Sequence, residues 1–539
     1  MSKKLAGILC MGGLLVLGAR DVSAQAHMLR GDSNHDLDID ISDGIATLGF
    51  LFLGSASPPC LDAADINDSG EIDIADGIFT FNFLFQGGPP PAAPYPTFEL
   101  DPTEDTLSCL GPPVTIQGDI TTSQTWTRDK VYELVGQVFV KSPAVVTIEM
   151  GTTILGDTTT DGLIVFERGS QVVAVGTETH PVVFTTDQPV GNRKRGDWGG
   201  VVILGRGQVN IPGGFGLAEG FVQPVQYGGG ATPDNTESSG QLSYVRIEWG
   251  GTQIAPNNEV NGLSLFAVGA GTQLDHIQVR FNNDDGIEWF GGAASLKYGI
   301  VEGCDDDMYD YSFGWSGNGQ FWVGQQKADT ADMGFEVDNS EVPPGTAGFV
   351  DTPITRPYIS NVTLAGPNDQ ATPKAQMGLL LRRGSGNHLY NFIVQGFKVA
   401  GLDVDDEVTC TQNYPDNLFV KNSIFYQNGA SGTQHAVAPG EAAPQDEAAW
   451  AAPCSNISQT LVDDPTNIKA TSSPVVDPYN VSAPNFRGQG ADVTTNPFDP
   501  TSGLPGGSFW EPAPYRGAVS PDPLADDWTQ KSWISYLDS

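Results

Sequence analysis

In residues 274–315, the side chains that could bind a metal ion or take part in catalysis are carboxylates that recur at a regular spacing. When this stretch is aligned with itself so that Leu274 falls on Leu296, Glu288 falls on Asp310. A period of this size, with glycine between short apolar runs, is typical of a β-solenoid. Matching positions of successive coils lie about 4.8 Å apart. We therefore expect an acidic ladder, made of Asp284, Asp285, Glu288, Asp305, Asp306, Asp307 and Asp310.

Two non-catalytic roles fit the acidic ladder. Its carboxylates could serve the fold by accepting hydrogen bonds from loop amides and by holding a structural calcium ion, because anions stacked about 5 Å apart repel one another. They could instead line a sugar-binding face beside flat aromatic side chains. The aromatic residues that would form this face are Trp289, Phe290, Tyr309, Tyr311, Trp315 and Trp322.

A catalytic role is the third alternative. Two carboxylates about 6.5–9.5 Å apart would suit an inverting glycosidase, whereas a calcium-dependent lyase would need a base, for which Arg280 and Lys297 are nearest in sequence. We favour a non-catalytic role, since carboxylates alone are weak evidence of an active site. The catalytic candidates are Asp284, Asp285, Glu288, Asp306, Asp307 and Asp310.

Two copies of a different acidic unit occupy residues 30–88, the first from Gly31 and the second from Ala64. Each copy has oxygen-bearing residues at positions 1, 3, 5, 7, 9 and 12, which is the spacing that wraps a loop around one calcium ion. Position 7 would contribute its backbone carbonyl. The ligands are Asp32, Asn34, Asp36, Asp38, Asp40 and Asp43 in the first loop, and Asp65, Asn67, Ser69, Glu71, Asp73 and Asp76 in the second. We predict Ca²⁺ as the cofactor.

This tandem pattern, with an apolar helix expected after each loop at residues 44–53 and 77–85, resembles the dockerin type I repeat, an EF-hand-like calcium-binding module of secreted bacterial proteins. Two departures matter. Leu37 replaces the glycine of position 6, which should strain the turn. Positions 10 and 11 are Ile41-Ser42 and Ile74-Ala75 rather than the usual Ser-Thr pair. The resemblance implies a protein partner for the module, but not cohesin.

The element that must position the acidic ladder is a long β structure. From residue 114 onward the sequence has short valine- and isoleucine-rich runs broken by glycine, such as VVTIEMGTTILG from Val145, which predict strands that add coil upon coil. The predicted fold class is therefore mainly β, a parallel β-helix with a small α-helical calcium module. The boundaries are 1–24 signal peptide, 30–88 calcium module, 89–113 Pro-rich linker and 114–539 β-helix with a C-terminal extension.

The β-helix region also resembles a family of secreted bacterial proteins with right-handed parallel β-helices and no established chemistry. The phrases that carry this resemblance are TWTRDKVYELVG from Thr125, GDWGGVVILGRG from Gly196 and LDHIQVRFNNDDGIEWFGG from Leu274. It implies a right-handed coil and an exported bacterial protein, and it contributes nothing on activity.

The stretch 1–24 has Lys3 and Lys4, an apolar run and a small-residue cleavage site at Ala24, so it predicts a signal peptide. Export permits disulfides. Proximity in sequence favours pairing Cys60 with Cys109 and Cys410 with Cys454, which leaves a buried, inert Cys304.

The formal net charge of −39 makes nucleic acid and anionic membranes poor partners and suits divalent cations. No later stretch predicts a membrane span. We expect a secreted or cell-surface calcium-binding protein whose β-helix presents a binding face for polysaccharide or another surface component. The alternative is a polysaccharide-degrading hydrolase or lyase.

Overall fold

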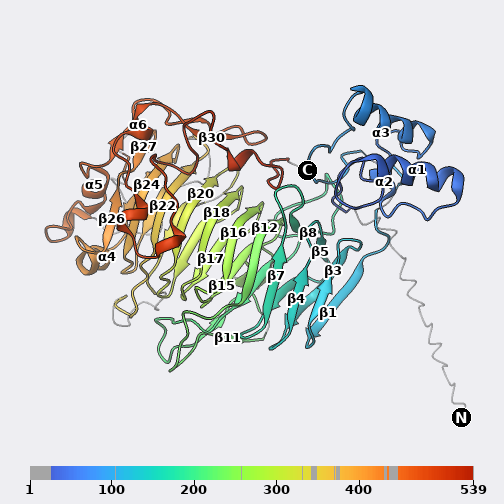
Figure 1. Ribbon diagram of the computed structural model, residues 1–539. Coiled ribbons are helices and arrows are strands. Elements are labelled where there is room, and N and C mark those ends of the chain that lie inside the picture. The colour runs from blue at the N-terminus through green and yellow to red at the C-terminus, as the bar shows by residue number, and fades with distance from the viewer. Residues whose placement is uncertain are drawn as a thin grey trace, which may run out of the picture.

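The computed structural model (Figure 1) describes residues 26–103, 105–107, 109–221, 223–255, 258–330, 332–340, 349–369, 371, 377–429, 434–435 and 447–537. A small helical module at the N-terminal end is followed by a long coil of parallel strands. The predicted signal peptide, residues 1–24, lies outside the described residues. Within the described residues, every helix is too short or too polar to span a bilayer.

Two loop-helix units build the N-terminal module. Helices α1 (Ile41–Leu53) and α3 (Ile74–Gln86) confirm the two predicted helices but begin earlier. They begin earlier because an aspartate at the end of each loop, Asp40 or Asp73, accepts a hydrogen bond from the backbone two residues later and caps the helix. The short helix α2 (Leu61–Ala64) lies between them.

The two helices of the module are packed with an internal twofold relationship. Gly44 of α1 lies against Phe81 of α3, and Gly77 of α3 lies against Leu48 of α1. A Cβ at Gly44 would come within 2.6 Å of the Phe81 ring, and one at Gly77 within 2.7 Å of Leu48. Glycine is therefore required at both positions for this close approach.

The first coils of the β-helix come from short strands that are rich in valine and isoleucine. These strands are β1 (Val114–Ile120), β2 (Gln124–Trp126), β3 (Tyr132–Val140), β4 (Val145–Ile148), β5 (Thr153–Gly156), β6 (Leu163–Phe166), β7 (Gln171–Val175), β8 (Val182–Thr186) and β9 (Val201–Leu204). All of them pair in parallel with strands of neighbouring coils. Branched side chains suit such strands, of which β5, β6, β8 and β9 are buried along their whole length.

In the central coils, one long and one short strand alternate along the chain. The long strands are β12 (Gly240–Glu248), β16 (Gln273–Arg280), β18 (Ser295–Glu302), β20 (Asn318–Gln325), β22 (Tyr358–Ala365) and β24 (Asn387–Gln395). The short strands are β15 (Leu263–Phe266), β17 (Ile287–Phe290), β19 (Tyr309–Ser312), β21 (Met333–Val337), β23 (Met377–Leu381) and β25 (Asp403–Val404). The stack ends with β26 (Leu418–Lys421), β27 (Ile424–Tyr426) and β28 (Ile468–Lys469).

The register of these strands confirms the predicted repeat. Long strands pair with long strands, so that Leu274 lies beside Leu296, and short strands pair with short strands, so that Glu288 lies beside Asp310. Each long strand bends at one residue with a positive φ, for example Tyr244 at 52°. These bends occur at the same place in every coil, at Tyr244, His276, Tyr298, Phe321, Asn361 and Asn391.

Smaller elements lie outside the parallel stack. Three antiparallel pairs are formed by β10 (Gly216–Ala218) with β11 (Val225–Tyr227), β13 (Gln253–Ala255) with β14 (Asn258–Glu259), and β29 (Val475–Asp477) with β30 (Asn485–Gly488). Short helices follow the central coils: α4 (Glu407–Asn413), α5 (Ile457–Val462), α6 (Ala491–Thr494) and α7 (Pro500–Gly503), with 3₁₀ turns at Glu447–Ala449, Gly507–Phe509 and Trp528–Gln530.

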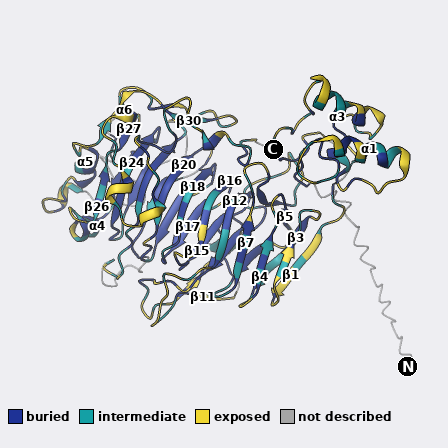
Figure 2. Cartoon of the chain, in the orientation of Figure 1, coloured by how far each residue is buried: buried dark blue, intermediate teal, exposed yellow. Residues whose placement is uncertain are grey.

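The core runs the length of the coil, and Figure 2 shows its strands buried. The aromatic residues that sequence suggested for a sugar-binding face belong to this core. Trp289, Tyr309, Tyr311, Trp315 and Trp322 are fully buried, and Phe290 packs in a second buried cluster with Phe221, Tyr227 and Phe266. That interpretation was wrong, because the inward positions of a solenoid strand need large apolar side chains to fill the coil.

The C-terminal segment, residues 470–537, returns along the long strands towards the module (Figure 1). Hydrogen bonds attach it to successive coils: Asn391 donates to Phe498, Gln320 to Glu511, and Gln278 to Ser535. This segment therefore covers one face of the β-helix.

Both predicted disulfides are present, Cys60–Cys109 and Cys410–Cys454. Cys304 is free and buried, as expected. Burial raises the pKa of its thiol to about 12, so it holds little thiolate at neutral pH and is inert.

Candidate functional site

The two acidic loops of the module share the hydrogen bonds made by their first and last aspartates. In the first, Asp32 accepts from the backbone N–H groups of Asp36 (3.0 Å) and Leu37 (2.9 Å). In the second, Asp65 accepts from Ser69 (3.0 Å) and Gly70 (2.6 Å). Position 1 of each loop therefore binds the backbone of positions 5 and 6, and the two loops are folded alike.

Position 12 closes each loop in the same way. Asp43 accepts from the backbone N–H of Asp40, and Asp76 from that of Asp73, each at 2.8 Å. The Glu71 carbonyl, at position 7, accepts from the Ser69 hydroxyl at 3.1 Å, so it points towards the other oxygen-bearing side chains. Oxygen ligands that converge in this way suit a hard cation such as Ca²⁺.

Buried carboxylates lie in both loops, and neither loop contains a lysine or an arginine that could neutralise them. Asp32, Asp43 and Asp76 are at most 2% exposed. Burial raises the pKa of Asp32 to about 6, that of Asp43 to about 7 and that of Asp76 to about 6. A cation would stabilise the ionised form of each.

The backbone at position 6 of each loop has the left-handed conformation for which we expected strain at Leu37. Leu37 has a φ of 79° and Gly70 a φ of 80°, so both loops need the left-handed conformation there. Glycine adopts it freely, whereas leucine is strained by about 1 kcal/mol or more. A Cβ built at Gly151 would lie 3.6 Å from the Leu37 side chain, so Leu37 lies close to the first coils of the β-helix.

The acidic ladder lies where the long strands turn into the short ones and along the outer side of β17, β19 and β21. Its oxygen atoms form three overlapping groups, each within 4.8 Å. These groups are Asp284, Asp285 and Asp306; Asp285, Glu288 and Asp310; and Asp307, Asp310 and Glu336. The structure thus brings six of the seven sequence-predicted carboxylates together, with Asp305 in none of these groups, and adds Glu336, whose register follows Asp310.

Hydrogen bonds from one coil to the next use the carboxylates of the ladder. Asp285 accepts from the backbone N–H of Asp307 at 2.9 Å, and Asp307 accepts from that of Met333 at 2.7 Å. Glu288 accepts from the side-chain amide of Asn261 at 2.6 Å. Such contacts are the ones expected if the ladder serves the fold by accepting hydrogen bonds from loop amides.

Most of the ladder is buried. Asp285, Glu288, Asp307 and Asp310 are at most 9% exposed. Burial, followed by the Asp306 carboxylate, raises the pKa of Asp284 to about 7. Burial also raises the pKa values of Asp285 and Asp307 well above the usual range. Carboxylates so enclosed are poorly placed to contact a polysaccharide chain.

The two bases suggested by sequence are engaged elsewhere. Arg280 is buried against Glu302 at 3.4 Å, and Lys297 pairs with Glu511 at 2.8 Å. Sequence reasoning missed Arg382, which pairs with Glu336 and Asp338 at the end of the ladder. A continuation of the repeat beyond Asp310 could have pointed to Glu336, but Arg382 lies on the next coil and has no signal in the repeat.

A cavity that sequence reasoning also missed lies between the long strands and the C-terminal segment. Its volume is about 290 Å³. One wall is the column of bend residues Tyr244, His276, Tyr298 and Phe321, whose rings stack at 4.2, 4.5 and 5.1 Å. Trp528 and Trp533 of the C-terminal segment stand nearly perpendicular to this column.

Polar groups surround the aromatic cavity. His276 Nδ1 lies 2.8 Å from Asp275, the Tyr298 hydroxyl donates to Glu511 at 2.9 Å, and Lys531 lies 2.8 Å from Asp526. The aromatic position recurs in the sequence as the third residue of LSY from Leu242, LDH from Leu274 and LKY from Leu296. Aligning these three phrases could have found the column. The tryptophans come from a distant part of the chain.

The comparisons with known proteins agree with this architecture. A family model described as a pectate-lyase-like β-helix domain matches residues 118–464, which is more than half of the chain. No curated protein and no solved structure gives a significant match. The matched residues cover the coils that carry the acidic ladder and the aromatic wall of the cavity. The chain belongs to the pectate-lyase-like β-helix family.

Proposed function

We propose that the protein is an exported, calcium-binding and non-catalytic polysaccharide-binding protein. The aromatic cavity carries this proposal, because rings beside carboxylate and histidine groups suit the apolar faces and hydroxyls of a sugar. A volume near 290 Å³ lies at the lower end of the range of ligand pockets, so it suits one sugar unit at a time.

The charge around the cavity selects among sugars. Glu178, Glu511 and Asp526 outnumber Lys531 at its edge, and the whole chain carries a net charge of −39. A polyuronate would be repelled by this field. We therefore propose a neutral polysaccharide as the ligand, although the family takes its description from pectate lyases.

Replacing His276 with alanine is expected to weaken binding of a neutral polysaccharide about tenfold, because one ring and one polar group leave the cavity wall. Affinity electrophoresis of the full-length protein against a panel of neutral glucans, galactans and polygalacturonate measures this. His388 is the matched control, since its ring stacks between Tyr358 and Phe419 away from the cavity. Equal retardation of H276A, H388A and wild type contradicts the proposal.

Calcium binding by the two loops is part of the proposal, and the matched hydrogen bonds of the loops support it. Gly70→Ala is expected to weaken calcium binding by the second loop about fivefold, because alanine at this φ is strained by about 1 kcal/mol while its Cβ has room. Calorimetric titration with CaCl₂ measures the change.

The control for this substitution is Gly54→Ala. Gly54 has a φ of 71° at the end of α1, with nothing near its Cβ position. It carries the same backbone strain outside the loops, so calcium affinity should stay at the wild-type value. Equal calcium affinities for G70A and wild type would contradict the assigned loop.

The exposed faces of α1 and α3 support a protein partner for the module. Ile41, Ile45 and Phe52 of α1 are 51, 58 and 62% exposed. The equivalent residues of α3, Ile74, Ile78 and Phe85, are 52, 48 and 65% exposed. Matched apolar side chains on a surface are unfavourable unless something covers them.

An enzyme that cleaves polysaccharide is the second candidate. Arg382 beside the acidic ladder favours it, because a base near carboxylates that hold a cation is the arrangement a lyase needs. Release of new chain ends from any polysaccharide of the panel, abolished by Asp310→Asn, would establish this activity instead.

A further inference from the structure

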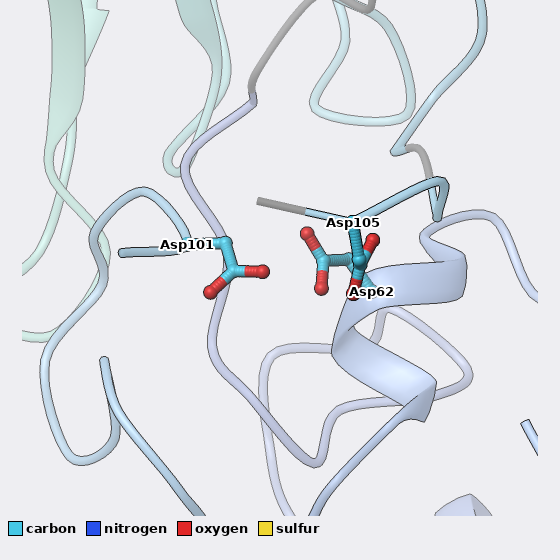
Figure 3. Close-up of side chains that lie close together, drawn as sticks. All are labelled: Asp62, Asp101 and Asp105. Carbon is cyan, nitrogen blue, oxygen red and sulfur yellow. The ribbon is translucent and has the colours of Figure 1, made fainter. Parts of the chain in front are cut away.

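A third acidic cluster lies beside the second calcium loop and outside the acidic ladder, and one of its members, Asp105, is also within 4.8 Å of Asp65 and Asp68 of that loop. It is formed by Asp62, Asp101 and Asp105, whose carboxylate oxygens lie within 4.8 Å of one another. Asp62 projects from α2, and the two other residues come from the second half of the predicted linker, residues 89–113 (Figure 3). The cluster therefore joins two parts of the chain that are distant in sequence.

Arg30 is the cation that this cluster already has. Its guanidinium is fully buried and lies 2.6 Å from Asp101, 3.2 Å from Asp68 and 3.5 Å from Asp62. It also donates to the backbone carbonyls of Ala93 and Asp65. One arginine thus faces four aspartates when Asp105 is included, and most of the negative charge is not compensated.

The arginine reaches only one oxygen of Asp101. Asp101 is 5% exposed; its Oδ1 atom binds Arg30, whereas its Oδ2 atom is buried and accepts no hydrogen bond from any described residue. The Oδ1 atom of Asp62 is likewise buried without a hydrogen bond from those residues, and its contact with Arg30 is an ion pair at 3.5 Å. A buried carboxylate oxygen that accepts no hydrogen bond is unfavourable. These oxygens belong to the carboxylates that face one another in Figure 3.

We propose that Asp62, Asp101 and Asp105 bind a third calcium ion. Calcium takes oxygen ligands at about 2.3–2.6 Å, so ligands on opposite sides of one ion lie about 5 Å apart. The 4.8 Å limit on the separations in this cluster agrees with that geometry. A set of ligands made only of carboxylates favours a hard cation over zinc. Asp105 is exposed, so water molecules could complete the coordination on its side.

The position of the ion gives it a mechanical role. Glu99 of the same segment pairs with Arg246 of β12, and Phe98 packs on His180 beside β8. Asp101 and Asp105 face the module, where the Cys60–Cys109 disulfide also lies. The ion would therefore fasten the module to the first coils of the β-helix, and calcium would fix the orientation between the two parts.

The test is the number of calcium ions bound by the full-length oxidised protein, measured by elemental analysis after equilibrium dialysis. A double variant of the loops, Asp43→Asn with Asp76→Asn, is expected to retain about one ion per chain. Adding Asp105→Asn to this loop variant is expected to remove the remaining ion, and the loop variant is the background because Asp105 also lies near Asp65 of the second loop. Asp105 is exposed, so this variant should fold.

Two outcomes would overturn the proposal. One is the same ion count for the loop variant with and without D105N; the other is a loop variant that binds no calcium. A proton is the competing occupant, because burial and then the Asp101 carboxylate raise the pKa of Asp62 to about 8. Dialysis is therefore repeated at about pH 9, where Asp62 is ionised. Failure of the loops alone would lower the wild-type count without affecting the loss caused by D105N.

Hydrogen exchange gives a second, independent measurement. Calcium is expected to slow exchange of the amides in residues 98–103 of the loop variant, and not in the same variant carrying Asp101→Asn. Magnesium at the same concentration should protect less, because it loses its water ligands reluctantly. Equal protection by calcium with and without D101N would also contradict the assignment.

Discussion

In the absence of metal ions, the protein is expected to become less stable as the pH rises from about 6.5 to about 8.5. The pKa of Asp284 is raised to about 7, and the pKa values of Asp285 and Asp307 lie well above the usual range, in each case chiefly because of burial. An unfolded aspartate titrates near 3.9. The folded protein therefore holds protons that the unfolded chain has released, and its stability decreases with pH until the folded groups ionise.

The pH range is chosen because other groups act in the opposite direction below it. Burial lowers the pKa of His180 and that of His388 to about 4. These two histidines make the protein more stable as the pH rises towards about 6.5, where an unfolded histidine loses its proton. Above that pH the raised aspartates dominate, and we expect a loss of at least about 2 kcal/mol.

Thermal unfolding followed by circular dichroism at several pH values in a chelator measures this dependence. Asp285→Asn with Asp307→Asn is expected to make the slope shallower, because an amide oxygen can still accept the bonds from Asp307 and Met333 without an ionisable group. Asp369→Asn, on the exposed surface, is the control and should leave the slope unchanged. A wild-type melting temperature that stays constant or rises across this range would contradict the expectation.

Replacing Trp322 with alanine is expected to lower the free energy of unfolding by about 3–5 kcal/mol. The ring is fully buried and stacks on Trp289 at 5.2 Å and on Tyr309 at 4.8 Å, and its indole N–H donates to the Leu296 carbonyl at 3.0 Å. Removing it leaves a cavity inside the coil and a carbonyl without its donor. Chemical denaturation monitored by circular dichroism measures the change.

The control is Phe52→Ala, because Phe52 is 62% exposed on α1 and its loss should change stability by about 0.5 kcal/mol or less. Binding of polysaccharide by folded W322A should equal that of wild type, since the side chain does not line the aromatic cavity. A W322A protein of normal stability that no longer bound polysaccharide would restore the sugar-binding role for this aromatic cluster.

Much of the architecture could be predicted because it depends on local rules. The sequence repeat that aligned Glu288 with Asp310 is the strand register itself, since identical coils place equivalent residues side by side. The positive φ at Leu37 was expected from the loop pattern alone, because position 6 has the same backbone requirement in both loops. Proximity in sequence was enough to pair the cysteines.

The candidate sites were less predictable because sequence spacing does not distinguish the inside of a coil from its outside. Trp289 and Glu288 are neighbours in the chain, yet the first points into the core and the second away from it. The repeat therefore grouped aromatic residues and carboxylates that face opposite sides of one strand. The same limitation hid the bend residue His276, whose partners across the cavity belong to the distant C-terminal segment.

The sequence by itself determined the repeated coil, the two matching acidic loops and the acidic ladder, because each depends on residues a few positions or one period apart. Only the tertiary structure decided what is buried and what meets across the fold. The return of the C-terminal segment brings Trp528 and Trp533 to the aromatic column, and the packing of the module brings Asp62 to Asp101. Such contacts have no local signal, since chain reversal and docking follow from the burial of surfaces on the whole molecule.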